Sequence, residues 1–230
     1  MFEVFFDFFQ LLFPNRCEAC GTHLVKGEQE ICLHCQQQIP KTHYWQQKGN
    51  IVEQFFWGRV PIETASSFFH FSKGSKYRKL LHNLKYNHSP QIGVALGSLY
   101  GAELKALPHY ADLAAIVPVP LHPKRFKHRG YNQSERIGYG LSQSMQVPMF
   151  DDAIVRARYN ETQTKKNREE RLQNVQNIFA ASNTVQHLQG KHVLVVDDVL
   201  TTGATLEVCI QALLQSVDCR VSVATLAVAR

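Results

Sequence analysis

Residues 193–205 combine an expected strand with side chains that suit a sugar phosphate. The run is VLVVDDVLTTGAT: four apolar residues, two acids, a Val-Leu pair, and then three threonines around Gly203 and Ala204. Four consecutive apolar residues favour a buried strand of a parallel sheet, and ligands of such sheets bind beyond the carboxyl ends of the strands. The carboxylates of Asp197 and Asp198 suit vicinal sugar hydroxyls, and the N–H groups and hydroxyls of residues 201–205 suit a phosphate. We therefore predict a site for a ribose 5-phosphate group.

A buried strand that ends in two acids also occurs in nucleoside triphosphatases and receiver domains. The first of these needs a phosphate loop of the form G-x-x-x-x-G-K-[ST]. The chain has one Gly-Lys pair, Gly190-Lys191, with Val185 where the first glycine belongs and His192 where serine or threonine belongs. This mismatch favours the sugar-phosphate interpretation.

A second group of reactive side chains lies near the start of the chain. Cys17 and Cys20 form one C-x2-C pair, Cys32 and Cys35 form another, and eleven residues separate the pairs. Two such pairs converge readily into a tetrahedral four-thiolate zinc site, which has no open position and is structural. Two disulfides or an iron–sulfur cluster are the alternatives. Because the sequence shows no export signal, we expect zinc rather than stable disulfides.

A third motif, IVPVPLHPKRFKHRGYNQSE, spans residues 116–135. It begins as an apolar strand, continues as a basic loop and ends at the start of a helix. Lys124 and Arg125 follow the strand at the point where a pyrophosphate would lie. The basic run taken alone is equally typical of a solvated surface loop.

These motifs together resemble the ComF family, the competence-associated proteins with a phosphoribosyltransferase-like domain. The resemblance lies in the four cysteines, the Pro-x-Pro-Leu and Arg-Gly-Tyr-Asn-Gln runs, and the thirteen residues 193–205, which resemble the phosphoribosyl pyrophosphate (PRPP) motif of type I phosphoribosyltransferases. It implies PRPP with Mg²⁺ as the ligand and Asp197 and Asp198 as the catalytic pair. The PRPP-binding residues that it implies are Thr201, Thr202, Gly203, Ala204, Thr205, Lys124 and Arg125.

Residues 162–172 form a polar, charged stretch, TQTKKNREERL. In type I phosphoribosyltransferases a mobile loop from this region closes over the active site, and the resemblance assigns that role to Lys165, Lys166 and Arg168. A charged surface loop and helix, with Glu169 and Glu170 pairing the arginines, is the alternative.

The charge balance indicates a polyanionic ligand. The chain carries a formal net charge of +6 and has a pI of about 9.0. Two basic runs, 73–85 and 124–129, are interleaved with aromatic residues, an arrangement typical of single-stranded nucleic acid grooves. The candidate DNA-binding residues are Lys76, Arg78, Lys79, Lys85, Lys127 and Arg129.

The motifs, together with the resemblance to ComF proteins, which implies the role in DNA uptake, lead us to expect one of two functions. The first is a PRPP-binding protein that acts in DNA uptake during natural transformation, binds single-stranded DNA and works with other uptake proteins. The alternative is an active phosphoribosyltransferase that moves phosphoribose from PRPP to a nitrogenous base and releases pyrophosphate. Release of pyrophosphate with a panel of bases discriminates between them.

The elements that must position these groups alternate between strand and helix after a short N-terminal module. We expect an apolar helix and the zinc-ribbon-like module over residues 1–48. Residues 49–230 should form an α/β domain with a doubly wound, mainly parallel sheet of the type I phosphoribosyltransferase kind, with 62–71 as a hood over the acceptor. The sequence contains no run of 18 apolar residues, the length needed to span a membrane, and we expect a cytoplasmic protein. The expected strands are 114–119, 154–157, 191–197 and 219–228, and the expected helices are 76–85, 91–107, 132–144, 168–175 and 203–216.

Overall fold

A parallel sheet of four strands forms the centre of the protein. The computed structural model describes residues 15–72, 74–156 and 178–229. The expected apolar helix at the N-terminus, the helix 168–175 and the loop residues Lys165, Lys166 and Arg168 lie outside these ranges. The strand order is β1-β6-β5-β2, and all neighbours are parallel, which confirms the expected sheet. In that order the strands are β1 Thr64–Phe71, β6 Arg220–Ala229, β5 His192–Leu200 and β2 Leu113–Pro118.

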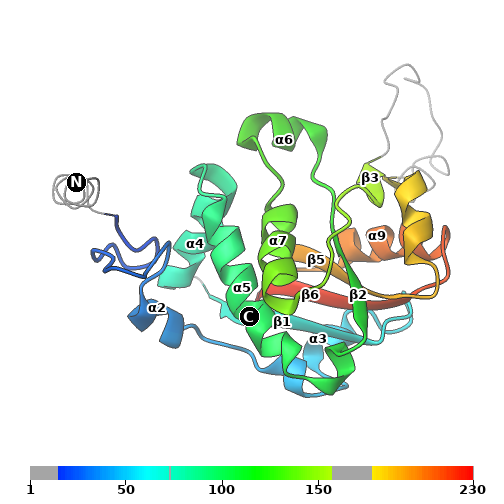
Figure 1. Ribbon diagram of the computed structural model, residues 1–230, viewed down its shortest axis with the longest axis horizontal. Coiled ribbons are helices and arrows are strands. Elements are labelled where there is room, and N and C mark those ends of the chain that lie inside the picture. The colour runs from blue at the N-terminus through cyan, green and yellow to red at the C-terminus, as the bar shows by residue number, and fades with distance from the viewer. Residues whose placement is uncertain (1–14, 73, 157–177, 230) are drawn as a thin grey trace.

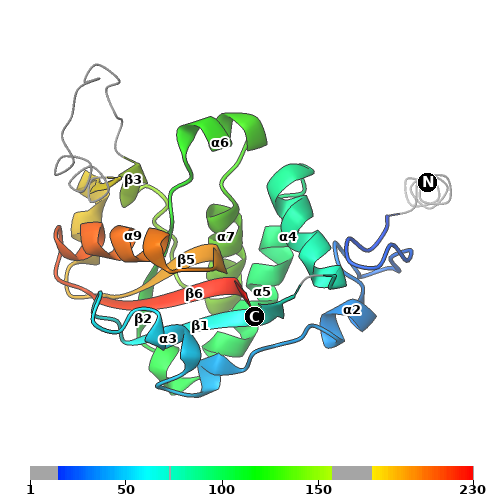
Figure 2. The same cartoon turned by 180° about the vertical axis from the view of Figure 1, so that it is seen from behind.

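Helices cover both faces of this sheet, as expected for a doubly wound fold (Figures 1 and 2). Alternate residues of β5 face opposite layers: Leu194 and Val196 belong to one buried cluster, and Val193 and Val195 belong to the other. Because every one of these four side chains is fully buried, the strand shows the continuous apolar run typical of parallel sheets. One face carries α4 Lys76–Tyr86, α5 Gln91–Lys105 and α7 Gln133–Met145, and the other carries α3 Ile51–Gln54 and α9 Ala204–Leu214.

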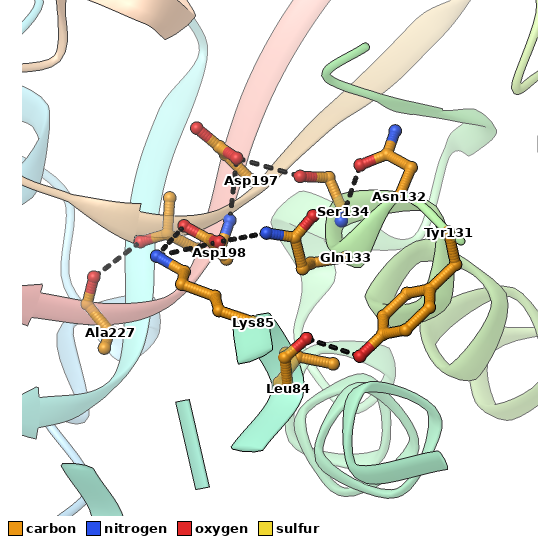
Figure 3. Close-up of polar contacts among 10 residues, drawn as sticks. Leu84, Lys85, Tyr131, Asn132, Gln133, Ser134, Asp197, Asp198 and Ala227 are labelled. Carbon is orange, nitrogen blue, oxygen red and sulfur yellow. Dashed lines mark hydrogen bonds and ion pairs between the residues drawn. The ribbon is translucent and has the colours of Figure 1, made fainter. Parts of the chain in front are cut away.

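Helices α5 and α7 approach each other closely through glycines. A Cβ atom on Gly140 would lie 2.2 Å from the carbonyl oxygen of Val94, and one on Gly97 would lie 2.3 Å from that of Ile137. Any larger residue at either position would push the helices apart. This contact fixes α7 against the sheet, so the first turn of α7 lies beside the end of β5 (Figure 3).

The remaining elements connect and flank this core. β3 and β4 pair antiparallel in a small second sheet beside α9. Helix α6 stands at the upper end of the molecule in Figure 1, between α4 and β3. These elements are α2 Leu33–Gln37, α6 Pro123–Arg129, β3 Ile154–Arg156, β4 Phe179–Ala181, η1 Tyr44–Gln46, η2 Pro108–Tyr110 and η3 Asn183–Leu188.

The structure corrects two expectations. Residues 62–71 do not form a hood: most of this segment is β1, which pairs in parallel with β6 and is buried from Thr64 to Phe69. The basic run 124–129 is not a loop but helix α6. His122 caps this helix by accepting a hydrogen bond from the N–H of Lys124, and Gly130 ends it with a φ of 80°.

Within the three described stretches, no helix has the length and apolar character needed to cross a membrane.

Candidate ribose-phosphate site and zinc centre

A cleft of about 750 Å³ opens beyond the carboxyl ends of β2 and β5. Its walls come from α4, α6, the first turn of α7, β3 and the loop that follows β5. Of the residues expected to bind PRPP, Asp197, Asp198, Thr201, Thr205, Lys124 and Arg125 line it. The cleft therefore brings together the two motifs that lie about 70 residues apart in the sequence.

The two carboxylates at the end of β5 are held from different sides (Figure 3). The Oδ1 atom of Asp197 accepts hydrogen bonds from the hydroxyl of Ser134, at 2.8 Å, and from the N–H of Asp198, at 2.9 Å. Asp198 forms an ion pair with Lys85 on α4, with 2.9 Å between Nζ and Oδ2, and accepts a longer bond of 3.5 Å from the amide of Gln133. The acids are thus fixed at the floor of the cleft.

The electrostatics of the pair are asymmetric. Burial and, after it, the adjacent charge of Asp198 raise the pKa of Asp197 to about 7, although the bonds from Asp198 N–H and Ser134 and the charge of Lys85 oppose the shift. Asp197 is therefore close to half-protonated near neutral pH. Such a perturbed acid in a cleft is a frequent property of functional sites.

The loop after β5 has the geometry of a phosphate cradle. Gly203 has a φ of 77°, is buried against Phe55 and Phe56, and caps the start of α9. Arg59 braces the loop from outside by donating a hydrogen bond to the carbonyl oxygen of Thr202 at 3.2 Å. The N–H of Ala204, the first of α9, donates a long hydrogen bond of 3.5 Å to the hydroxyl of Thr202, and the exposed side chains of Thr201 and Thr205 line the cleft, where an anion could meet them. The remaining residues expected to bind PRPP also belong to this segment: Thr202 and Gly203 lie in the loop, and Ala204 is the first residue of α9.

Arg156 is a cleft residue that the sequence analysis missed. It lies at the end of β3, where its Nε donates to the carbonyl oxygen of Pro120 at 3.1 Å and its guanidinium lies 4.9 Å from the ring of Phe179. Ser134 and Gln133 were also missed. Gln133 and Ser134 belong to the motif 116–135, so that motif was the available signal for them, whereas Arg156 lies within the short expected strand 154–157 and outside any motif.

The residues expected to bind DNA divide into two groups. Arg78, Lys85 and Arg129 line the cleft, whereas Lys76, Lys79 and Lys127 do not. Lys76 instead donates to Gln38 at 2.8 Å, beside the cysteine module. Arg129 is buried, and its guanidinium lies 5.2 Å from the ring centre of Tyr86.

The four N-terminal cysteines form a cluster with zinc-site geometry. All four sulfur atoms lie within 4.8 Å of one another, and Cys20 and Cys32 are 3.8 Å apart. Zn–S bonds of about 2.3 Å in a tetrahedron put the sulfur atoms roughly 3.8 Å apart, so the cluster fits zinc. The N–H of Cys32 donates to the sulfur of Cys17 at 3.3 Å, a contact that stabilises a thiolate. His23 and His34 stay outside the cluster.

This cysteine module is attached to helix α4. The hydroxyl of Tyr77 donates to the carbonyl oxygen of Cys35 at 2.8 Å, and the amide of Asn83 donates to the carboxylate of Glu18 at 2.6 Å. Together with Lys76 and Gln38, these contacts run along α4. Because α4 also forms one wall of the cleft, the module braces that wall.

Comparison with known proteins connects both sites to described domains. Residues 132–230 match the model of the phosphoribosyl transferase domain, and residues 8–46 match the double zinc ribbon domain. Competence protein F of Haemophilus influenzae is 27% identical over 209 residues, covering 84% of this chain and 88% of that protein. DNA utilization protein YhgH of Escherichia coli is 28% identical over 222 residues, covering 90% and 93%.

Among solved structures, the glutamine PRPP amidotransferase of Bacillus subtilis covers 60% of this chain and 26% of its own, with 22% identity and a TM-score of 0.42. A score this low carries no functional argument. The fold and the two sites define a phosphoribosyltransferase-like protein with an N-terminal zinc ribbon. The similarity to a competence protein and to a DNA utilization protein over most of the chain supports the expected resemblance to the ComF family.

Proposed function

We propose that the protein binds PRPP, together with Mg²⁺, in the cleft at the end of β5 and binds single-stranded DNA along the mouth of the same cleft. The observation that carries the proposal is the convergence of Asp197 and Asp198, the loop 201–205 and the cations of α6 on one cavity. The names of the relatives, a competence protein and a DNA utilization protein, favour a role in DNA uptake or use.

Each wall of the cleft suits one part of PRPP. The loop 201–205 and the start of α9 would hold the 5-phosphate, and the acids would accept hydrogen bonds from the ribose hydroxyls. Lys124, Arg125 and Arg156, which line the same cleft, would neutralise the pyrophosphate. Mg²⁺ keeps several waters and binds mainly through phosphate oxygens, so it would enter with the ligand.

The rim of the cleft suits a nucleic acid strand. Arg78, Arg125 and His128 present positive or protonatable groups around the opening. Tyr86 and Phe126 stand exposed on α4 and α6, at 54% and 48%. Aromatic faces stack on any base and cations bind the phosphates, which together give binding without sequence preference.

Calorimetry with PRPP and Mg²⁺ tests the ribose site. Charge-assisted hydrogen bonds are worth about 1.5 to 3 kcal/mol each, so Asp→Asn at 197 or 198 should weaken PRPP binding by roughly ten- to a hundredfold. Asp218→Asn is the matched control, because it removes an exposed acid at the opposite ends of the strands. Equal affinity of the wild type and the double Asn variant would refute the assignment.

Phosphoribosyl transfer is the second candidate, because three cations surround the expected position of the leaving pyrophosphate. A nearby carboxylate pair would stabilise the positive charge that develops on the ribose. Release of pyrophosphate from PRPP in the presence of a base would support transfer, and its absence across a panel of bases would leave binding as the function.

A further inference from the structure

Lys85 stands between the two ligands proposed for the cleft. Its ammonium lies 3.0 Å from Oδ1 and 2.9 Å from Oδ2 of Asp198, and both side chains are partly buried, at 24% and 14% exposure (Figure 3). Lys85 belongs to α4, the helix that also turns Arg78 and His82 toward the cleft. Residues 78, 82 and 85 share one face of a helix, so Lys85 continues the row of nitrogen-bearing side chains along the cleft wall.

The ion pair occupies groups that each ligand needs. Asp198 must turn its oxygens to the ribose hydroxyls, yet both of them now face Lys85. Lys85 must turn its ammonium to a phosphate, yet it now faces Asp198. Either ligand therefore competes with the pair, because the ammonium of Lys85 and both oxygens of Asp198 point at each other and have to turn toward a new partner.

We propose that Lys85 is a positioning residue shared by the two ligands: it holds Asp198 in the empty cleft and is released to nucleic acid phosphate when ribose hydroxyls occupy Asp198. This inference rests on the function proposed above. Its consequence is that sugar phosphate and single-stranded DNA bind with positive cooperativity. Nothing in the local sequence links Lys85 to Asp198, since 113 residues separate them.

The sign of the coupling follows from which ligand breaks the pair. The first ligand to bind loses the free energy of the Lys85–Asp198 contact, and the second finds its own partner already free. Linkage requires the same coupling free energy in both directions. Gln133 and Ser134 keep the acids oriented after Lys85 leaves, because neither of their hydrogen bonds involves α4. Repulsion between two anions in one cleft acts in the opposite direction.

The test measures the affinity of a thymidine oligonucleotide of about 30 residues with and without saturating ribose 5-phosphate, by fluorescence anisotropy. Ribose 5-phosphate is the suitable probe because it has no pyrophosphate and so leaves the cations of α6 free for DNA. In the wild type we expect binding to tighten by about fivefold, the low end of allosteric coupling, because the pair is partly exposed.

Three variants separate this role from a merely structural one. Lys85→Met keeps an aliphatic side chain but loses the charge, so only repulsion between the two anionic ligands is left. The ratio of the DNA affinity with ribose 5-phosphate to that without it should then fall to one or below. Lys85→Arg should restore part of the ratio, because it keeps the charge. Lys48→Met is the control: Lys48 is exposed and lies outside the cleft, so the ratio should equal that of the wild type.

Each outcome decides the proposal. A wild-type ratio of one or below, or equal ratios in the wild type and Lys85→Met, would overturn the coupling while both ligands still bind. Failure of the wild type to bind ribose 5-phosphate in calorimetry would instead overturn the proposed ribose site, and the coupling with it. Failure to bind the oligonucleotide at low salt would overturn the DNA function and the coupling but leave the ribose site standing.

Discussion

At the scale of single residues, the acid pair at the end of β5 determines how the cleft behaves. Asp197 and Asp198 adjoin each other, and burial adds to their repulsion, so one of them holds a proton more tightly than a free carboxyl does. The groups that face Asp197 are Asp198 itself, Lys85 from α4, Ser134 from α7, Arg156 from β3 and Cys209 from α9. The site therefore changes its charge close to neutral pH.

This pKa leads to a prediction about ligand binding. Asp197, with its pKa raised to about 7, accepts ribose hydrogen bonds best when ionised, so the affinity for ribose 5-phosphate should fall as the pH drops below 7. Titration calorimetry from pH 5.5 to 8.5 measures the profile. Because the phosphate of the ligand also titrates near pH 6, Asp197→Asn is the reference, and its profile should lack the step that belongs to Asp197.

The same pKa shift affects stability with the opposite sign. The folded state holds the Asp197 proton more tightly than the unfolded state, so the contribution of this group to stability declines as the pH rises from about 4 to about 7. Asp197→Asn should remove that decline, so that at pH values above 7 the variant unfolds at a higher urea concentration than the wild type. An unchanged pH dependence of the midpoint would show that the carboxyl is not perturbed.

At the scale of elements, α4 joins the two parts of the chain. One side of it accepts the zinc module through Tyr77 and Asn83, and the other side presents Arg78, His82 and Lys85 to the cleft. The position of α4 therefore depends on whether the module is folded. This arrangement gives a structural zinc an effect on a site that it does not touch.

We expect the Cys32→Ser variant to lose its zinc and to bind both proposed ligands more weakly. Structural zinc in small modules contributes about 10 to 16 kcal/mol of apparent binding free energy, so residues 15–46 should loosen while the sheet persists. Without this brace α4 should shift, and the protein should bind ribose 5-phosphate and DNA roughly three- to tenfold less tightly. Elemental analysis and calorimetry measure the two effects.

The control for this variant is His34→Ala, which removes an exposed potential ligand that lies beside Cys35 but outside the cluster. It should keep one zinc per chain and wild-type affinity. A Cys32→Ser protein that retains a full equivalent of zinc would contradict the four-thiolate site.

At the scale of the whole molecule, positive charge and the cleft coincide at one end of the sheet. The cleft between α4 and α6 is lined by the exposed cations Arg78, Lys124 and Arg125, and the net charge of +6 draws anions to the protein. For single-stranded DNA, a plot of the logarithm of the affinity against the logarithm of the salt concentration should have a slope of about −0.7 for each phosphate contacted.

Reversal of Arg78 and Lys79 to Glu should reduce that slope by about 1.4, because two phosphate contacts are lost. Lys76 is a poorer choice, since its ammonium already contacts Gln38. The double reversal Lys48→Glu and Lys105→Glu changes the net charge equally at exposed positions away from the cleft. If both double variants shift the slope alike, the binding follows total charge rather than this surface.

Much of this architecture could be predicted from the sequence, for reasons that particular residues make clear. The run 193–196 is apolar because β5 is buried on both faces, and the strand and the helix after it were expected nearly at their observed bounds. β1 was misassigned because Ser66 and Ser67 interrupt its apolar pattern. Within the core, the hydroxyl of Ser66 bonds with those of Tyr100 and Tyr110, and this pairing makes a polar residue tolerable there.

The site was less predictable than the fold. The acids, the threonine loop and the cysteines form contiguous motifs, so their roles could be hypothesised locally. Helix α6 was missed because a dense row of cations suggests a loop, although His122 and Gly130 mark its ends. The contacts of Lys85 and Ser134 with the acids join elements far apart in the chain, and no local pattern encodes them.

The most direct test of the central claim is a crystal structure of the full chain with ribose 5-phosphate bound. We predict density for the phosphate on the loop 201–205 at the start of α9, with the ribose hydroxyls on Asp197 and Asp198 and Lys85 moved away from Asp198. Density for the sugar phosphate elsewhere, for example on α6 alone with the Lys85–Asp198 pair intact, would contradict the account.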